Sequence, residues 1–237
     1  KSYSSSVTEV TLFSNISNPA LLAKSNNIAG ISIIPQTFGL QELSQKSVGS
    51  IHNFSSFTFG SSYQNYGFEL FRQQIFSVGI SKKITDNFFV GSSLVLDFLD
   101  IKNYGSKQIS KINIGVSFSP SEKLNLGFAI KNLLQKKFTD SDIAPQSNIL
   151  LGISYLPTKN FSLHFQIDKE RNRDISIAAG LELGFYDFLS VRSGYSDNPD
   201  IYSFGISIKL KLVEIDYAVQ IHSYLEETQM FGVKINY

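Results

Sequence analysis

Alternation of large apolar residues with small or polar ones is the pattern that most limits how this chain can fold. In residues 111–130 (KINIGVSFSPSEKLNLGFAI), every second position is apolar from Ile112 to Phe118 and, after a polar break, from Leu124 to Ile130. A period of two places alternate side chains on opposite faces of a β-strand. The pattern therefore predicts strands with one wholly apolar face. The other face carries Asn113, Gly115, Ser117, Asn125, Gly127 and Ala129.

The same alternation recurs along most of the chain and predicts about fourteen strands. Short polar breaks such as ITDN, SPSEK, LPTKN, FYDF and KLVE alternate with longer polar links such as NYGSKQ, DKERNR, YSDNPD and SYLEETQ, and one long loop is expected near 134–147. Short turns that alternate with longer loops are typical of an up-and-down barrel in a bacterial outer membrane, where the short turns lie at the periplasmic rim.

An antiparallel sandwich is the soluble alternative, because its strands also alternate. A sandwich exposes long charged and β-branched residues, whereas Gly, Ser, Ala and Asn are frequent on the less apolar face here. Charged residues make up 17% of the chain, below the roughly 25% of soluble domains. A closed barrel also pairs all backbone groups and leaves no sheet edge. We therefore predict an all-β fold, a 14-stranded antiparallel up-and-down transmembrane β-barrel in the bacterial outer membrane, with its apolar face against lipid.

A short helix is expected before the first strand, in residues 17–27 (SNPALLAKSNN). Asn18 suits an N-cap and Pro19 suits the first helical position. We predict an N-terminal segment, residues 1–27, followed by the barrel, residues 28–237. The segment would either plug the barrel mouth or lie beneath the barrel as a surface helix, and the sequence leaves both possibilities open.

The motif Asn-Pro-Ala-Leu-Leu-Ala at residues 18–23, followed by repeated hairpins such as ISKKITDNFFVGSSL, resembles the PorV/PorQ group of outer-membrane proteins, relatives of the FadL fatty-acid transporters. The resemblance implies a plugged barrel that acts as a non-enzymatic subunit or accessory of a larger outer-membrane assembly, such as a type IX secretion complex. A FadL-like channel for hydrophobic or small solutes is the alternative. The implied partners are outer-membrane lipid and other outer-membrane or periplasmic proteins. The implied plug motif is Asn18, Pro19, Ala20, Leu21 and Leu22.

Motifs for catalysis, metal binding or cofactor binding are not found in the sequence. The three histidines, His52, His164 and His222, have no neighbour at metal-ligand spacing, and there is no cysteine. No GxSxG, Walker or GxGxxG motif is present. The formal net charge is +1 and no dense basic block occurs, which argues against nucleic acid. We predict no catalytic residue, no metal site, no cofactor and no nucleic-acid partner.

Charged residues of both signs fall on the predicted lumen face. Inward placement avoids a cost of about 2–4 kcal/mol for a charge facing hydrocarbon at the midplane. We expect Glu182 to pair with Arg192 across the FYDF turn, and Lys209 to pair with Glu214 or Asp216 across the next turn. Such a network would either brace a closed lumen or line a selective pore. Its predicted members are Glu182, Arg192, Lys209, Lys211, Glu214 and Asp216.

Overall fold

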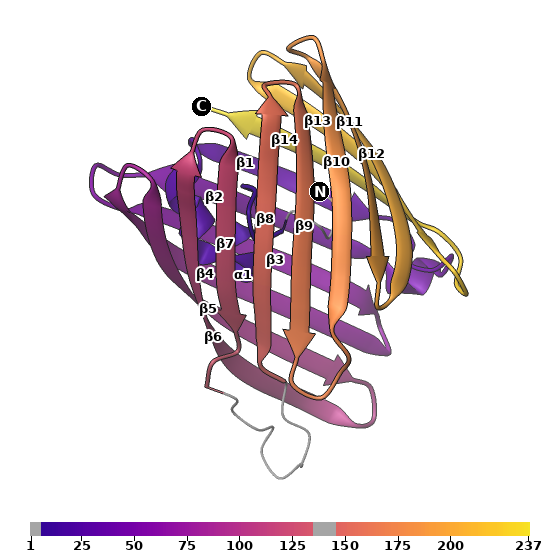
Figure 1. Ribbon diagram of the computed structural model, residues 1–237. Helices are drawn as coiled ribbons and strands as arrows, with labels where there is room; N and C mark the ends of the chain where they lie inside the picture. The colour runs from indigo at the N-terminus through magenta and orange to yellow at the C-terminus, as the bar shows by residue number, and fades with distance from the viewer. Residues whose placement is uncertain (1–5, 135–145) are drawn as a thin grey trace.

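Fourteen strands follow one another around a closed barrel in chain order (Figure 1). The computed structural model describes residues 6–134 and 146–237. All neighbouring strands are antiparallel, and the last strand, β14 (Thr228–Asn236), closes the barrel by pairing with the first, β1 (Ile28–Ile34). The predicted fold class is confirmed. The strands between them are β2 (Gln45–Asn53), β3 (Thr58–Phe68), β4 (Phe71–Thr85), β5 (Phe88–Ile101), β6 (Gly105–Ser121), β7 (Leu124–Lys131), β8 (Asn148–Thr158), β9 (Phe161–Glu170), β10 (Ser176–Phe185), β11 (Leu189–Asp197), β12 (Asp200–Leu210) and β13 (Val213–His222).

Large apolar side chains point out of the barrel and small or polar ones point into the lumen. On β12, Phe204 and Ile206 are 49% and 38% exposed, whereas Ser207 is 4% exposed. The outward residues form a continuous apolar band, which is the surface that lipid requires. Among the described residues, no helix has both the length and the apolarity needed to cross a membrane.

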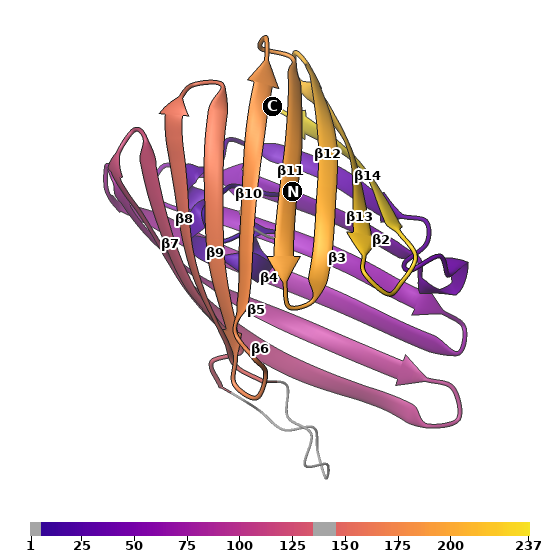
Figure 2. The same ribbon diagram turned by 45° about the vertical axis from the view of Figure 1, so that its right-hand side comes forward.

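The wall is uneven, because consecutive strands differ in length. Strands β4, β5 and β6 have 15, 14 and 17 residues, whereas β7 has 8. Figure 2 shows the β5–β6 hairpin extending past the short neighbouring strand β7. Long strands of this kind carry polar residues beyond the apolar band while keeping their ladder hydrogen bonds.

Two links that we expected to be longer loops are tight turns. Pairing of β5 with β6 continues to Ile101 and Gly105, and pairing of β11 with β12 continues to Asp197 and Asp200. The polar residues of NYGSKQ and YSDNPD are therefore mostly strand residues outside the apolar band, and polarity did not mark the strand ends. The long loop expected near 134–147 lies mostly outside the described residues.

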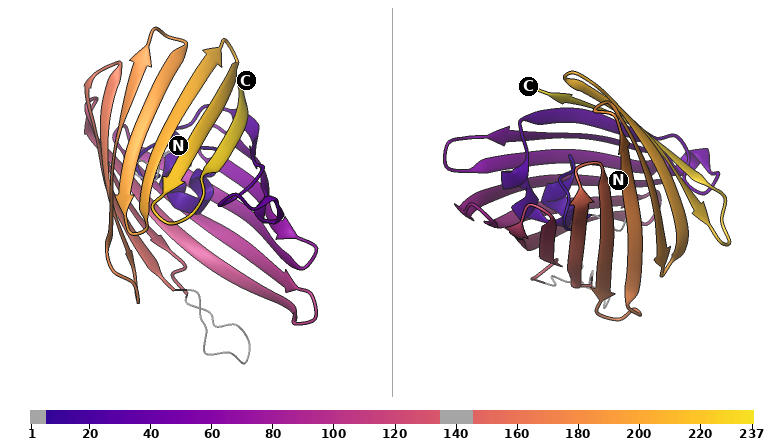
Figure 3. Two further views of the ribbon diagram at one scale, coloured as in Figure 1. Left: turned by 90° about the vertical axis from the view of Figure 1, so that its right-hand side faces the viewer. Right: turned by 45° about the horizontal axis from the view of Figure 1, so that its top comes forward.

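The described part of the N-terminal segment, residues 6–27, lies inside the barrel. It contains a short α-helix, α1 (Ser14–Ser17), and two 3₁₀ turns in η2 (Pro19–Lys24). Figure 3 shows both helices surrounded by the strands. A third short helix, η3 (Gln41–Leu43), lies in the link between β1 and β2. Of the two arrangements left open by the sequence, the structure has the segment in the lumen; residues 1–5 lie outside the described part of the chain.

Candidate functional site

The plug motif is buried at the centre of the segment. Asn18, Ala20, Leu21 and Leu22 are 0% exposed, and Pro19 is also fully buried. The Asn18 side chain acts as the N-cap of η2, because its Oδ1 accepts a hydrogen bond from the Ala20 backbone N–H at 3.1 Å. The sequence prediction of a capped helix at Asn18 is therefore confirmed, although the helix is 3₁₀ rather than α-helical.

The amide of Asn18 also joins the plug to the wall. Its Nδ2 donates to the backbone carbonyl of Val7 at 2.8 Å and to that of Val116, on β6, at 3.1 Å. One buried side chain therefore caps η2 and hydrogen-bonds both an earlier turn of the plug and the barrel wall. Loss of any of these bonds would leave a buried polar group without a partner.

Serine hydroxyls on the wall form hydrogen bonds with other residues of the plug. The Asn15 Nδ2 donates to Ser77 Oγ at 2.5 Å and to Ser62 Oγ at 3.2 Å. The Ser81 hydroxyl donates to the backbone carbonyl of Ala20 at 3.0 Å. These bonds come from β3 and β4, so that side of the barrel binds the plug through both packing and hydrogen bonds.

Lys24 ends the plug near the β6–β7 turn. Its Nζ donates to Ser119 Oγ at 2.9 Å and to Asn125 Oδ1 at 2.8 Å. Burial lowers the pKa of the Lys24 ammonium, an effect that the nearby Glu9 carboxylate partly offsets. The ammonium also lies 5.5 Å from the centre of the Phe89 ring, a favourable cation–π distance.

Glycines form the surface against which the plug packs. A Cβ added at Gly91 on β5 would lie 2.5 Å from the backbone of Pro19, and one at Gly60 on β3 would lie 2.5 Å from the Leu22 side chain. Side chains at these positions would push the plug off the wall. Each strand from β1 to β8 contributes one glycine at which an added Cβ would meet the plug at 3.0 Å or less: Gly30, Gly49, Gly60, Gly79, Gly91, Gly115, Gly127 and Gly152.

An ionic network covers the opposite wall, from β10 to β14. Arg192 Nε lies 2.9 Å from Glu182 Oε2, and its Nη1 lies 3.4 Å from Asp216 Oδ1. Lys234 Nζ lies 2.7 Å from Glu214 Oε1 and 3.0 Å from Asp216 Oδ2. The Ser207 hydroxyl also donates to Asp216. The side chains of the five charged residues are 12–25% exposed, so water screens these pairs only in part.

Four of the six predicted network residues meet in this cluster, and the expected pair of Glu182 with Arg192 is present. Lys209 and Lys211 do not join it; both are exposed, and Lys211 lies in the β12–β13 turn. Glu214 stands opposite Lys209 on one side and Lys234 on the other. The structure pairs Glu214 with Lys234, whose side chain extends into the lumen. The predicted pairing of Glu214 with Lys209 was therefore wrong.

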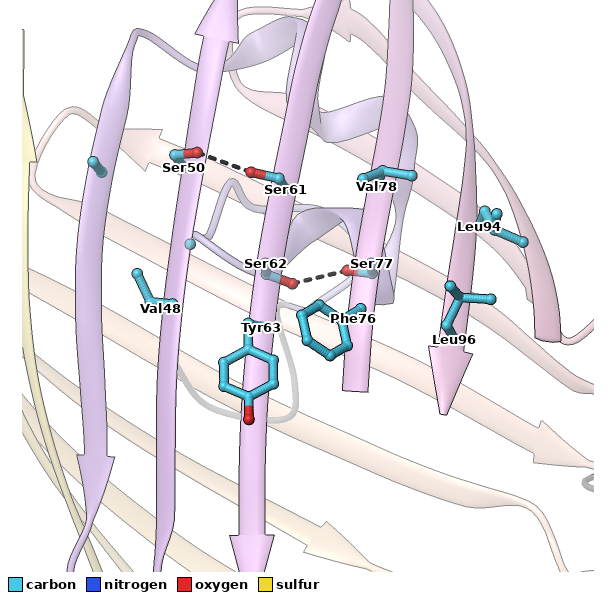
Figure 4. A pocket seen from close by; sticks show the side chains of 12 residues that line it. Val48, Ser50, Ser61, Ser62, Tyr63, Phe76, Ser77, Val78, Leu94 and Leu96 are labelled. Atoms are coloured by element: carbon cyan, nitrogen blue, oxygen red, sulfur yellow. Dashed lines mark hydrogen bonds between the residues drawn. The ribbon is translucent and has the colours of Figure 1, made fainter. Parts of the chain in front are cut away.

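A shallow groove interrupts the lipid-facing surface over β1 to β5. Figure 4 shows its floor, where the Ser50 and Ser61 hydroxyls are hydrogen-bonded at 3.0 Å. Larger side chains, including Val48, Tyr63 and Phe76, rise around it, and its volume is about 370 Å³. Because Ser50 and Ser61 satisfy each other, the groove presents an apolar surface to the membrane.

A family model described as type IX secretion system membrane protein PorP/SprF matches residues 66–230. The chain belongs to the PorP/SprF family. The match runs from the end of β3 into β14 and leaves out the plug. The family found is thus a different one from the PorV/PorQ group that the motif of residues 18–23 suggested, and that motif lies outside the matched range.

Solved structures with a similar fold include two toluene transporters and a FadL homologue. The toluene transporter TbuX of Ralstonia pickettii superposes with a TM-score of 0.74 at 11% identity, covering 97% of this chain and 94% of that one. A Pseudomonas aeruginosa FadL homologue gives 0.67 at 12%, covering 99% and 95%, and the P. putida toluene transporter TodX gives 0.67 at 11%, covering 96% and 94%. No curated protein matches the chain in sequence. The family and the fold place the protein in the bacterial outer membrane.

Several residues that make the site were not predicted. Asn15 and the glycines facing the plug were not identified as site residues from the sequence, and Lys234 was placed on the lumen face but not in the network. The glycines had a signal: each falls at an inward position of its strand, two residues from an inward Ser or Asn. That signal predicts a crowded lumen, but the identity of the neighbour at each glycine follows only from the path of the plug.

Proposed function

We propose that this protein is a non-enzymatic subunit or accessory of a type IX secretion assembly in the outer membrane. The match of residues 66–230 to the PorP/SprF family is the observation that carries the proposal. The partners would be other secretion components and outer-membrane lipid.

The filled lumen supports a structural role. The plug contacts strands β1 to β8, and the network from β10 to β14 ties the remaining wall together. The tight turns β4–β5, β6–β7 and β12–β13 leave little protein outside the barrel on that rim. Binding to partners would then use the outer wall and the rims rather than an internal pocket.

The groups around His164 resemble part of a hydrolytic triad, which needs serine on one imidazole nitrogen and the acid on the other. His164 Nδ1 faces Ser154 Oγ at 2.7 Å, while Nε2 faces Glu9 Oε1 at 3.3 Å and Ser162 Oγ at 2.8 Å. Ser154 is 0% exposed and His164 is 5% exposed. A substrate could not reach the Ser154 hydroxyl, which favours a non-enzymatic role.

Affinity purification from native outer membranes in mild detergent tests the assembly role. We expect tagged protein to retain type IX secretion components, and deletion of the gene to stop secretion of type IX cargo. The matched control is an unrelated outer-membrane barrel with the same tag. A barrel that purifies alone, together with normal secretion in the deletion strain, would refute the proposal.

A channel for hydrophobic or small solutes is the second candidate. Space remains between the plug and the wall: a pocket of about 120 Å³ is lined by Thr11, Leu12 and Phe13 of the plug and by Asp216, Met230 and Lys234 of the wall, among others. Two structural neighbours that share the fold, TbuX and TodX, are toluene transporters.

Conductance in planar bilayers separates the two candidates. A channel would conduct or pass solute as the full chain, and more so after deletion of residues 6–24. A structural subunit would stay closed as the full chain and open only in the deletion variant. A barrel that is closed in both forms would exclude the channel.

A further inference from the structure

Three side chains from distant parts of the sequence meet in the lumen. Glu9 belongs to the plug, His164 to β9 and Glu182 to β10. One nitrogen or oxygen atom of each lies within 4.8 Å of those of the other two. His164 is 5% exposed. His164 and Glu182 are diagonal neighbours on paired strands, because Gly180 stands opposite His164 and Ser162 stands opposite Glu182.

We propose that Glu9, His164 and Glu182 form a binding site for a divalent cation of the Zn²⁺ type, which ties the plug to β9 and β10. One imidazole nitrogen and two carboxylate oxygens are a ligand set that suits Zn²⁺. Ca²⁺ and Mg²⁺ prefer oxygen ligands alone. The site would reach the part of the wall that the plug-facing glycines do not cover.

The surroundings of His164 orient it as a metal ligand. Its Nδ1 lies 2.7 Å from Ser154 Oγ, which in turn lies 2.6 Å from Thr8 Oγ1. A proton on Nδ1 that donates to Ser154 leaves the lone pair of Nε2 facing Glu9. Metal-bound histidines are held in this way by a hydrogen bond from the other nitrogen.

A cation between Glu9 and His164 would stabilise their contact. Glu9 Oε1 and His164 Nε2 lie 3.3 Å apart, and both carry lone pairs when the imidazole is neutral and its proton is on Nδ1. A metal ion bound to both atoms would remove this repulsion. The Ser162 hydroxyl, 2.8 Å from Nε2, is the group that such an ion would displace.

The charge of the surrounding cluster also favours a cation. Glu182 belongs to the ionic network and Glu9 lies beside it, so four carboxylates face the two permanent cations Arg192 and Lys234. Counting Lys24, which also acts on Glu9, the set is still negative. Arg192 holds Glu182 Oε2 at 2.9 Å and Oε1 at 3.4 Å, so Oε1 is the oxygen more weakly held and available to a metal.

Calorimetric titration of the purified barrel with Zn²⁺, after treatment with a chelator, tests the site. At neutral pH we expect one Zn²⁺ per chain, a higher unfolding temperature and no such effect with Mg²⁺ at equal concentration. His164→Gln and Glu9→Gln should each weaken Zn²⁺ binding at least tenfold. Glu9→Gln leaves the wall strands unchanged, so it remains informative if His164→Gln folds poorly.

Two other histidines provide matched controls. His222→Gln alters another lumen histidine and His52→Gln alters one beside Tyr237, and both variants should bind Zn²⁺ like the parent. Ser162→Ala removes the competing hydroxyl and should bind at least as tightly. The proposal fails if the parent takes up no Zn²⁺, which would mean that a proton alone bridges Glu9 and His164. It also fails if His52→Gln rather than His164→Gln abolishes binding.

Discussion

The wall from β1 to β8 and the wall from β10 to β14 face the same lumen but close it by different chemistry. On the first wall, glycines let the backbone of the plug lie against the strands. On the second wall, charged side chains bridge from strand to strand: Arg192 reaches Glu182 and Asp216, and Lys234 reaches Asp216 and Glu214. The wall from β1 to β8, here called the glycine wall, packs closely against the plug. The wall from β10 to β14, here called the ionic wall, is held together by ion pairs.

This difference predicts which substitutions each wall tolerates. Close packing of backbone on backbone fails when a single methyl group is added, because neither side can move away. A network of ion pairs has flexible side chains and responds to salt and to the loss of a charge instead. Variants in the two walls should therefore differ in kind as well as in size.

Asn18→Asp should have the largest effect on the glycine wall. The aspartate would place a carboxylate oxygen where the Asn18 amide now donates to the carbonyls of Val7 and Val116. We expect the free energy of unfolding in lipid vesicles, measured by circular dichroism in urea, to fall by about 3 kcal/mol at neutral pH. Acidic pH, which neutralises the carboxyl group, should restore part of the loss.

Asn103→Asp is the matched control, because Asn103 is exposed in the β5–β6 turn at a φ of 69° that aspartate also adopts. It should leave the free energy of unfolding nearly unchanged. Equal losses in the two variants would show that Asn18 does not hold the plug.

Gly91→Ala should break the fit of the plug by adding one methyl group. The new Cβ would lie 2.5 Å from the Pro19 backbone. Overpacking of this kind costs about 1–3 kcal/mol, and limited proteolysis should find the N-terminal segment more accessible.

Gly205→Ala on β12 is its counterpart in the ionic wall. The nearest atom to its added Cβ is 3.4 Å away, an ordinary contact. This variant should unfold like the parent or slightly later. If Gly91→Ala and Gly205→Ala lose equal free energy of unfolding, the glycines of the first wall are not needed for packing against the plug.

The strands of both walls were predictable from the sequence, because alternation identifies a strand and its two faces without knowledge of its neighbours. The pair Glu182–Arg192 was also predictable, since it lies across one tight hairpin turn. Register beyond a single hairpin was not. Lys234 takes the place expected for Lys209 because β14 and β12 flank Glu214 equally in the register, and sequence alone does not rank them.

The path of the plug was predictable only at its cap. Asn18 and Pro19 form a local signal, whereas Val7 touches Gly127 and Gly152, on strands far along the chain. The contact between Glu9 and His164 likewise depends on how a segment crosses the lumen. Such contacts depend on how the barrel closes around the plug, and they cannot be predicted from residue spacing in the sequence.

Arg192→Gln should weaken the ionic wall by an intermediate amount. It removes the cation shared by Glu182 and Asp216. We expect a loss of about 1–2 kcal/mol in the free energy of unfolding at low salt. Added salt should reduce this loss, because it screens the carboxylates left behind, and should not reduce the loss caused by Gly91→Ala.

The double variant Glu182→Gln with Arg192→Gln measures the pair itself. It should be more stable than the sum of the two single losses predicts, since neither charge is then left alone. Additive losses, or equal salt dependence in Gly91→Ala and Arg192→Gln, would remove the distinction between the two walls.

Asp86→Asn at the rim should have the smallest effect. Lys83 Nζ lies 2.7 Å from Asp86 Oδ1, a shorter distance than any of the three ion pairs of Arg192, yet Asp86 is 99% exposed. The hydrogen bond from Lys83 and its charge lower the pKa of Asp86, so any stabilisation is present above the ordinary carboxyl pKa and is lost as the pH falls through the lowered one. Water and salt screen this pair, and we expect urea unfolding curves of Asp86→Asn and the parent to superpose from pH 3 to 7. A clear shift of the Asp86→Asn unfolding curve would mean that an ion pair stabilises this barrel even when it is exposed to water. Superposed curves would mean that the lumen ion pairs stabilise the barrel because they are shielded from water.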